Sequence, residues 1–325
     1  MDEPFFSIVI PVYNGTHTID ACLQAATAID WPKFEVIVVD DMSTDGTGQK
    51  IARHPVRHIT LSKKGGASGA RNAGVDAANG EFVFFIDSDC VPPKNLLRQA
   101  AQALREEGRD LVIGGTYTPL AHDHGLFSSF QSVFVNYSET KYREPDYIAT
   151  HAMLMPMAVF RNHGRFDEHF LPILEDVELC HRWRRQGVKL VMRNELQVAH
   201  IFRFTLWRSL KNAYRKSRWW TLYSLRNKDY LEDSGTASVE LKSNVVLWAI
   251  ETLSLLVYLF TGLAGFLWLT LGAIALSVLL SRRLLAAYFR SGGGIGFALG
   301  CVLYYLLVYP IPVALGSLRG LLPHR

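Results

Sequence analysis

The feature that most constrains the fold is a long apolar stretch near the C-terminus. From Ser243 to Ser281 the chain holds one acid, Glu251, no base, and otherwise mostly Leu, Val, Ala, Ile, Phe and Trp. A helix needs about 20 apolar residues to cross a bilayer. The stretch is therefore long enough for two membrane spans, with the turn between them expected at Thr261-Gly262.

A third apolar segment follows, in which Pro310 and Pro312 would bend or end a helix. The predicted membrane segments are 244–261, 263–281 and 295–315. Arg282 and Arg283 predict a return to the cytosol after the second segment, because cytosolic loops tend to be basic. Three spans would put the basic C-terminus outside, so a re-entrant third segment is the alternative.

Charge is divided unevenly along the chain. Residues 241–325 hold six of the 34 basic residues and one of the 30 acidic ones, so the net charge of +4 belongs to this end. The nearly neutral remainder gives no support to nucleic-acid binding. The cysteines are scattered without a CxxC pair, which predicts neither a disulfide framework nor a zinc site: Cys22, Cys90, Cys180 and Cys301. The acidic start "MDEPFFSIVI" lacks the basic lead of a signal peptide, so the N-terminal domain is expected in the cytosol.

A basic and aromatic stretch precedes the apolar region. Residues 201–226, "IFRFTLWRSLKNAYRKSRWWTLYSLR", hold seven bases and no acid, together with Trp207, Trp219 and Trp220. This pattern favours a helix lying on an anionic membrane surface. The alternative is a helix that packs on the soluble domain and exposes a basic face.

The first 200 residues alternate short apolar runs with helical patterns. "FFSIVIPV", "FEVIVVD" and "EFVFFID" are nearly continuous apolar strands, which are typical of a mostly parallel sheet covered by helices on both faces. The fold class is therefore α/β. We expect this domain over 1–200, an interfacial helical region over 201–240 and a membrane domain over 241–325.

Three of the predicted strands end in polar clusters. The clusters are Pro11-Val12-Tyr13-Asn14, Asp40-Asp41 and Asp87-Ser88-Asp89. Ligands of open parallel sheets bind at the carboxyl ends of the strands, so these clusters are expected to share one edge. Unpaired carboxylates at the end of a buried strand are costly, which favours a solvated end or a bound cation.

Four sequence blocks together resemble those of family 2 glycosyltransferases, which have the GT-A fold, a Rossmann-like mostly parallel sheet. The blocks are "SIVIPVYNG", "VIVVDDMSTDGT", "GASGARNAGVDAANGEFVFFIDSD" and "EDVELCHRWRRQG". They appear in the family's order within residues 5–205, and the apolar tail resembles the appended helices of lipid-facing members.

The resemblance implies a nucleotide-sugar site. Pro11, Tyr13 and Asn14 would line the nucleotide pocket, Asp41 would accept a hydrogen bond from the base, and Asp40 would shape the loop. A carboxylate acceptor suits uracil or guanine equally. Helix N-capping by the acids and hydroxyls of residues 40–47 is the alternative, and both roles are compatible.

A glycine-rich segment that includes Gly69 precedes a helix, whose N-terminus would attract a phosphate. Arg71 would bind a phosphate or steady the metal-binding carboxylates. Such a segment is otherwise only a turn.

Asp87-Ser88-Asp89 matches the DxD motif. The resemblance makes Asp87 and Asp89 ligands of Mn²⁺ or Mg²⁺ that bridges the donor diphosphate, with Asp87 and Ser88 also contacting the nucleotide-sugar. A histidine at a similar distance after the acid pair completes the metal site in some members, which makes His200 a third ligand and tilts the preference toward manganese. A structural histidine is the alternative.

Glu175-Asp176 begins the fourth block. First-turn acids often only stabilise a helix. The resemblance makes Asp176 the general base that deprotonates the acceptor, with Glu175 orienting the acceptor or the loop, and leaves Glu178 on the helix surface.

Together, the resemblance and the apolar tail predict an inverting, metal-dependent hexosyltransferase. We expect it to be a multi-pass inner-membrane protein with a cytoplasmic catalytic domain. Its expected role is in cell-envelope polysaccharide synthesis. We expect a UDP- or GDP-sugar donor and a lipid-linked or glycan acceptor beside membrane lipids. "RKSRWW" has Arg215 where processive synthases have Gln, which disfavours processive synthesis, and "ATHAMLMPM" replaces the usual acceptor-side block. The alternatives are a polyprenyl-phosphate glycosyltransferase that needs no base, and a nucleotide-sugar-binding membrane sensor without turnover.

Overall fold

The computed structural model describes residues 3–170, 172–228 and 232–322, and the chain divides into two compact units. The first unit comprises Met1–Asp123 and Glu139–Phe202, and the second comprises His124–Ser138 and Arg203–Arg325. Helix α5 (Leu126–Glu139) therefore belongs almost wholly to the second unit, although the strands on either side of it in the sequence belong to the first.

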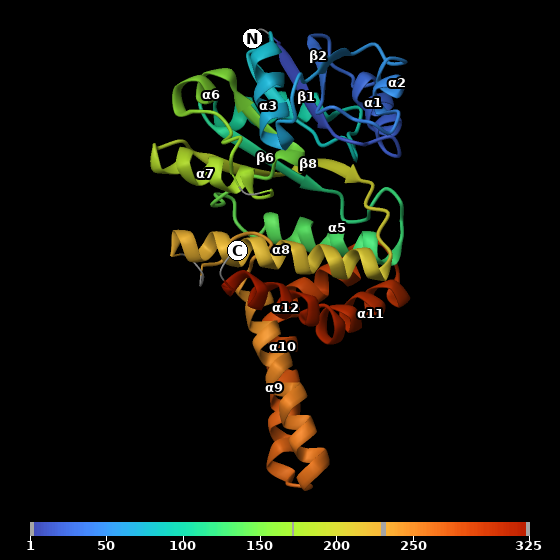
Figure 1. The fold of residues 1–325 in the computed structure, drawn as a ribbon, viewed down its shortest axis with the longest axis vertical. Helices are drawn as coiled ribbons and strands as arrows, with labels where there is room; N and C mark the ends of the chain where they lie inside the picture. The colour runs from blue at the N-terminus through green and yellow to red at the C-terminus, as the bar shows by residue number, and fades with distance from the viewer. Residues whose placement is uncertain (1–2, 171, 229–231, 323–325) are drawn as a thin grey trace. The chain divides into compact units, whose positions relative to one another are not determined.

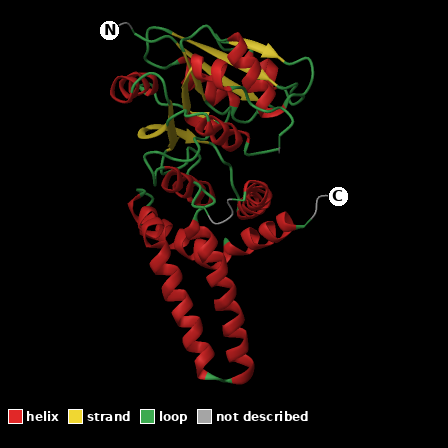
Figure 2. Ribbon diagram, turned by 90° about the vertical axis from the view of Figure 1, so that its left-hand side faces the viewer, coloured by secondary structure: helices red, strands yellow, loops and turns green. Residues whose placement is uncertain are grey.

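The first unit is built on a mixed, mostly parallel sheet (Figure 2). Its strands are β1 (Phe6–Val12), β2 (Phe34–Asp40), β3 (Arg57–Thr60), β4 (Phe82–Phe85), β5 (Cys90–Val91), β6 (Val112–Tyr117), β7 (Met153–Pro156) and β8 (Leu190–His200). They lie in the order β3-β2-β1-β4-β7-β6-β8-β5. Strands β3, β2, β1 and β4 are mutually parallel, and β7 runs antiparallel to both of its neighbours. The predicted α/β class with a mostly parallel sheet is confirmed.

The helices of this unit follow the strands along the chain. They are α1 (Ile19–Thr27), α2 (Thr47–Ile51), α3 (Gly66–Ala77), α4 (Leu96–Glu107), α6 (Met157–His163) and α7 (Glu175–Arg185), with the 3₁₀ turn η1 (Thr150–Ala152). Helix α3 packs directly on β1 because Gly74 lacks a side chain: a Cβ there would lie 2.3 Å from Val9 Cγ1. This close approach holds the N-terminus of α3 at the carboxyl ends of β1 and β2.

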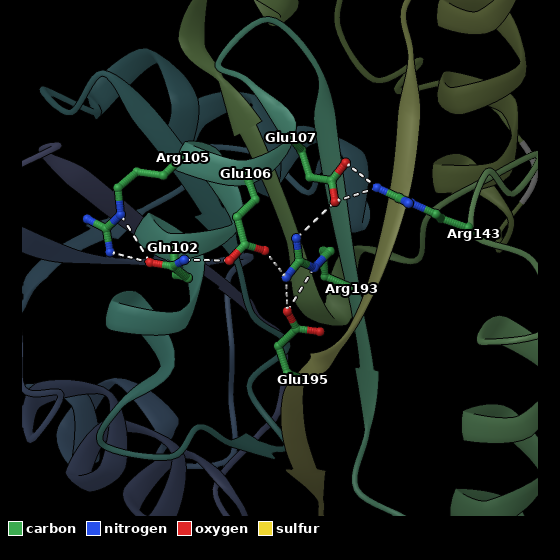
Figure 3. A network of polar contacts seen from close by, with 7 residues as sticks. All are labelled: Gln102, Arg105, Glu106, Glu107, Arg143, Arg193 and Glu195. Atoms are coloured by element: carbon green, nitrogen blue, oxygen red, sulfur yellow. Dashed lines mark hydrogen bonds and ion pairs between the residues drawn. The ribbon is translucent and has the colours of Figure 1, made fainter.

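A network of charges joins α4 to β8 (Figure 3). Arg193 Nη1 lies 2.9 Å from Glu107 Oε1, and Arg193 Nη2 lies 2.6 Å from Glu106 Oε2. Arg143 donates to both carboxylate oxygens of Glu107 at 2.9 Å, and Glu195 is a further partner of Arg193. The side chain of Glu107 is buried, which reduces solvent screening of its pairs relative to isolated surface pairs. We assign this network a structural role.

The second unit is helical. Its elements besides α5 are α8 (Leu206–Asn227), α9 (Val239–Thr261), α10 (Ala264–Arg290), α11 (Ile295–Leu303), the π-helical turn η2 (Tyr304–Val308) and α12 (Pro310–Leu321). Among the described residues, three helical stretches are long and apolar enough to cross a membrane: Val239–Thr261, Ala264–Arg290 and Ile295–Leu321. The predicted turn at Thr261-Gly262 is confirmed, because α9 ends at Thr261 and Gly262 adopts a positive φ of 67°.

Two of these stretches form an antiparallel hairpin, α9 with α10, and the third lies across it (Figures 1 and 2). Helix α10 continues through Arg282 and Arg283 and ends only at Arg290, which is longer than the predicted segment. Polar side chains join α9 to its neighbours: Asn244 donates to the Tyr305 carbonyl at 3.0 Å and accepts from Ser277 Oγ at 2.5 Å. Buried polar groups need such partners, because an unmade hydrogen bond is costly away from water.

Helix α12 packs along α8 through two glycines spaced four residues apart. A Cβ at Gly316 would lie 2.1 Å from Ser217 Oγ and 2.3 Å from the Tyr214 carbonyl oxygen, and one at Gly320 would lie 2.6 Å from the Arg218 carbonyl oxygen. Small residues at this spacing let two helix backbones approach closely. The third apolar stretch is thus fixed against the basic helix α8.

Gly316→Ala is therefore expected to destabilise the second unit by about 1–3 kcal/mol, the usual range for an overpacked contact, because the Tyr214 backbone cannot rotate away as a side chain would. The measurement is the thermal midpoint of the detergent-solubilised protein. Gly272→Ala on α10 is the matched control, since a Cβ there meets no atom within 4 Å. Equal midpoints for the two variants would contradict the close packing.

Candidate active site

The carboxyl ends of β1, β2 and β4 bring the predicted polar clusters to one edge of the sheet. Val12 pairs with Asp40 across β1 and β2, and the Asp41 N–H donates to the Val12 carbonyl at 2.9 Å. On the other side of β1, the Ile86 N–H donates to the Val9 carbonyl at 3.2 Å. Parallel register therefore aligns the three strand ends, as the sequence pattern predicts.

The loops after β1 and β2 are tied together by side chains. Asn14 has a positive φ of 51°, donates its N–H to Ser43 Oγ at 2.8 Å and accepts from the Thr44 N–H at 2.9 Å. Asp40 accepts from the Ser43 N–H at 2.9 Å. Asn14 and Asp40 are thus occupied in shaping a common loop.

Asp41 binds the start of α3. Its two carboxylate oxygens accept from the N–H groups of Gly65 and Gly66 at 2.8 and 3.1 Å. Asp41 follows β2, but its carboxylate caps α3 and not α2, the next helix in the sequence. Each carboxylate oxygen keeps a lone pair for a further donor. It can therefore hold the glycine loop and accept from a ligand at the same time.

A cavity of about 340 Å³ lies beside this loop, lined by Lys63, Lys64, Gly65, Gly66, Ala67, Ser68, Asp167, Glu168, His169, Phe170, Pro172 and Glu175. Tyr13 presents a 48% exposed ring, with the Lys64 ammonium 3.7 Å from its centroid. Pro11 is half-buried within β1, and Gly69 lies in the first turns of α3 facing Glu168. Lys64 therefore lines the cavity and also contacts the exposed Tyr13, which itself lies outside the lining.

Arg71 joins the DxD loop to α7. Its Nη2 donates to Asp87 Oδ1 at 2.9 Å and its Nη1 donates to Glu175 Oε1 at 2.6 Å, with the guanidinium buried. Its Nε has no hydrogen-bond partner in the described ranges. The sequence leaves two roles open for Arg71, binding a phosphate or steadying the metal-binding carboxylates. The contacts observed are with carboxylates.

Asp89 and His200 face each other because β5 pairs antiparallel with the end of β8. Cys90 is opposite His200 in the register, and His200 Nε2 lies 3.3 Å from Asp89 Oδ2. Burial opposes ionisation of Asp89, but the charge of His200 lowers the pKa of Asp89 below its ordinary value. Ser88, between the two acids, is half-buried in the same turn.

The donor set here suits a divalent cation. One ligand atom each from Asp89, Cys90 and His200 lie within 4.8 Å of one another. Burial raises the pKa of the Cys90 thiol well above its usual range, so the carboxylate and the imidazole are the better ligands. His200 Nδ1 is buried without a hydrogen-bond partner in the part of the chain that is described, so the site has an unused donor or acceptor. Asp87 lies in the same turn but is paired with Arg71.

Asp176 lies in the first turn of α7, after Leu174 with its positive φ of 74°. Its carboxylate accepts from its neighbour Val177 N–H at 2.9 Å and from the Thr150 N–H at 3.4 Å. Burial and the adjacent Glu175 raise the pKa of Asp176 to about 6, against the opposing charge of Arg71. A carboxyl group with a pKa near neutrality is suited to accept a proton.

Sequence reasoning missed a buried group beside these residues. His151, in the "ATHAMLMPM" block, pairs with Glu139, whose carboxylate also accepts from Thr116. Cys90 was also missed as a neighbour of the metal ligands, although its place next to Asp89 was a usable signal. The partners of His151 come from distant parts of the sequence, so no local pattern marks it.

The mixed, mostly parallel sheet with carboxylates at its strand ends is a fold of the GT-A type. Residues 7–162 match the family model "Glycosyl transferase family 2". This region is therefore similar to family 2 glycosyltransferases, and three long apolar helical stretches follow it within the described residues.

Known proteins resemble the domain more than the whole chain. Glycosyltransferase AglE of Haloferax volcanii is 36% identical over 118 residues, which is 34% of this chain and 39% of that protein. UDP-Glc:alpha-D-GlcNAc-diphosphoundecaprenol beta-1,3-glucosyltransferase WfgD of Escherichia coli is 31% identical over 117 residues, 35% of this chain and 46% of that protein. The chain thus spans less than half of either curated relative.

Among solved structures, mannosyltransferase PcManGT of Pyrobaculum calidifontis, in complex with GDP-Man and Mn²⁺, shares the fold. The superposition covers 98% of this chain and 88% of that one, with a TM-score of 0.59 at 17% identity. At this identity the likeness concerns the fold alone.

Proposed function

We propose that the protein transfers a sugar, with inversion, from a nucleotide-sugar to a membrane-associated acceptor. The observation that carries the proposal is the pairing of two features in one unit: the Asp89–His200 pair, suited to a cation, and Asp176 with its raised pKa beside the Arg71–Glu175 bridge. The curated relatives align with about a third of this chain, so the activity of the whole protein is proposed here from its own residues.

The donor would occupy the edge formed by β1, β2 and α3. Asp41 would accept an N–H from the base, and Tyr13 offers an exposed side chain, with Lys64 over one face of its ring, against which the base could stack. Relatives and neighbours that use UDP-Glc and GDP-Man support a UDP- or GDP-sugar.

Asp89 and His200, with Asp87, would hold Mn²⁺ or Mg²⁺. When bound, the cation neutralises charge on the donor diphosphate as the nucleoside diphosphate leaves. Arg71 offsets only part of the negative charge of the surrounding carboxylates, so an excess remains for a cation to balance. The Mn²⁺ in the related mannosyltransferase structure is consistent with this choice.

Asp176 would act as the base. As the acceptor oxygen forms a bond to the anomeric carbon, its proton passes to Asp176 and the bond from that carbon to the phosphate oxygen breaks. Glu175, held by Arg71, keeps the start of α7 in place. Attack from the face opposite the leaving group gives inversion.

A lipid-linked acceptor is favoured by the second unit. A cavity of about 530 Å³ lies among α5, α8, α9, α10 and α12, with apolar residues such as Val246, Leu276 and Leu280 in its lining. Helix α8 is basic and without acids, as expected beside an anionic lipid. We place the protein in the inner membrane, with the catalytic domain on the cytosolic side.

Val246→Trp should fill the mouth of this cavity, since Val246 is 60% exposed and lines it. We expect transfer to a long-chain prenyl-diphosphate sugar to fall by about tenfold, a loss near 1.4 kcal/mol, with transfer to a short-chain water-soluble analogue unchanged. Leu259→Trp is the matched control, exposed on the same helix but outside the cavity lining. An equal loss with both acceptors would argue against a lipid role for the cavity.

The proposed function is tested by radiolabel transfer from UDP-, GDP- and dTDP-sugars into a lipid extract, with and without Mn²⁺. A donor that binds the native state should also raise the thermal midpoint in proportion to its affinity. Donor binding without transfer to any acceptor would favour the sensor alternative. If no nucleotide-sugar bound in the presence of Mn²⁺ or Mg²⁺, the proposal would be wrong.

A further inference from the structure

A buried histidine–glutamate pair lies beside the candidate site, and the roles proposed above leave it unassigned. His151 on η1 is 5% exposed, and its Nε2 lies 3.2 Å from Glu139 Oε2, an ion-pair contact without hydrogen-bond geometry. Glu139 Oε2 also accepts from Thr116 Oγ1 at 2.8 Å. Taking two charges out of water is costly, so a buried pair of this kind is weak support for stability alone.

Stacked aromatic rings fix the orientation of His151. The Tyr117 ring lies 3.9 Å from the His151 ring, with 24° between their planes. Tyr117 also contacts the ring of His200, edge-on at 4.8 Å between centroids, and His200 pairs with Asp89. His151 is thus one aromatic ring away from the residues suited to a metal.

The residue before His151 contacts the proposed base. The Thr150 N–H donates to Asp176 Oδ2 at 3.4 Å, and Thr150 and His151 both belong to the single turn η1. At this length the hydrogen bond is near the limit of a useful contact, so small movements of η1 decide whether it forms. Whatever holds His151 in place therefore also sets the contact with Asp176.

We propose that His151, held by Glu139, is a positioning residue for Asp176: it fixes η1 so that the Thr150 N–H binds the carboxylate, and its positive charge favours the ionised base. This inference rests on the proposed function, in which Asp176 takes the acceptor proton. It gives the unusual "ATHAMLMPM" block a role in catalysis through Asp176, without contact to the sugar.

The electrostatics agree with this arrangement. Burial alone would lower the pKa of His151, but Glu139, then Asp87 and Asp176, raise it above the ordinary value. His151 in turn is among the groups that lower the pKa of Asp89.

The charged groups around Asp176 come from three elements. Glu175 lies on its own helix, Arg71 comes from α3, and His151 acts from η1. Cys180 is also nearby but stays neutral, because burial raises the pKa of its thiol. If the His151 charge were lost, Arg71 would be the remaining cation among these groups that offsets the effect of Glu175 on Asp176. The pKa of Asp176 would then rise, which favours its protonated form.

The test compares His151→Phe, which keeps a ring to stack on Tyr117, with Glu139→Gln. In His151→Phe the acidic limb of the pH profile of kcat/KM should move up by about 0.5–1 pH unit, and the rate at pH 6.5 should fall about three- to tenfold. In Glu139→Gln the limb should move less, because this change removes a negative charge as well as the partner of His151. Donor affinity should stay within about twofold. The double variant should lose no more than His151→Phe does alone, since both changes remove one pair.

Hydrogen exchange gives a second readout that needs no activity. In a peptide covering residues 148–156, the Thr150 amide should exchange faster in both variants than in the wild type, with unchanged exchange of the peptides that cover β1 and β2 serving as the folding control. Unchanged exchange together with an unchanged pH profile in both variants would overturn the positioning role. A wild-type protein that transfers no sugar would overturn the proposed function instead, and the exchange result would still decide whether His151 holds η1.

Discussion

Asp176→Asn is expected to lower the rate of sugar transfer by about 10²–10⁴-fold, the usual contribution of a positioned general base. The amide keeps the shape of the side chain, and its single oxygen can still accept from the Val177 N–H, although it cannot also accept from the Thr150 N–H as the second carboxylate oxygen does. It cannot take the acceptor proton at neutral pH. Donor binding should be retained, because the contacts proposed for the nucleotide lie on β1, β2 and α3.

The pH dependence follows from the same residue. The pKa of Asp176 is raised to about 6, so the wild-type rate should rise with pH through that value as the carboxylate forms. A carboxyl group whose pKa is raised by folding makes the native state less stable as pH rises from its unfolded pKa to its folded one. The thermal midpoint of Asp176→Asn relative to wild type should therefore increase between about pH 4 and pH 7.

Glu178→Gln is the matched control for this prediction. Glu178 lies on the same helix but pairs with Arg182 at 3.0 Å, so its loss should leave the transfer rate nearly unchanged. Full activity of Asp176→Asn would remove Asp176 from the role of base. It would point instead to an acceptor that is already anionic, such as a polyprenyl phosphate.

The sequence predicted the sheet and the edge that carries the site for a physical reason. Strands buried on both faces must be nearly continuous apolar runs, as in "FEVIVVD", and parallel strands end at the same edge. The polar residues that follow such runs, Asn14, Asp41 and Asp87, could therefore be placed near one another without knowing the strand order.

Pairings between distant residues could not be predicted in this way. Arg71 reaches Glu175, which is 104 residues away, and Glu139 reaches Thr116 and His151 only through the tertiary packing of the first unit. These contacts depend on how elements pack, and no periodicity records it. The direction of the third apolar stretch could not be predicted for the same reason. Composition gives the length of this stretch, but it does not show that the stretch packs along α8.

Arg71→Met is expected to destabilise the first unit by about 3 kcal/mol, because it leaves Asp87 and Glu175 without their shared countercharge. This value is at the lower end for a broken buried pair, since the side chain of Asp87 is 31% exposed and can be partly solvated. Arg71→Lys should recover only part of the loss. An ammonium keeps the charge but lacks the planar fork that reaches two carboxylates at once.

The thermal midpoint, with and without Mn²⁺, distinguishes this explanation from a simple packing defect. If the carboxylates repel each other after the change, a divalent cation bound by Asp87 and Asp89 should raise the midpoint of Arg71→Met more than that of the wild type. Arg98→Met is the matched control, because Arg98 and Asp30 form a surface pair with exposures of 64% and 71% and should contribute less than about 1 kcal/mol. If Arg71→Met melted together with Arg98→Met, the bridge would not be holding α7 and the DxD loop, and the proposed geometry of the base relative to the metal would lose its support.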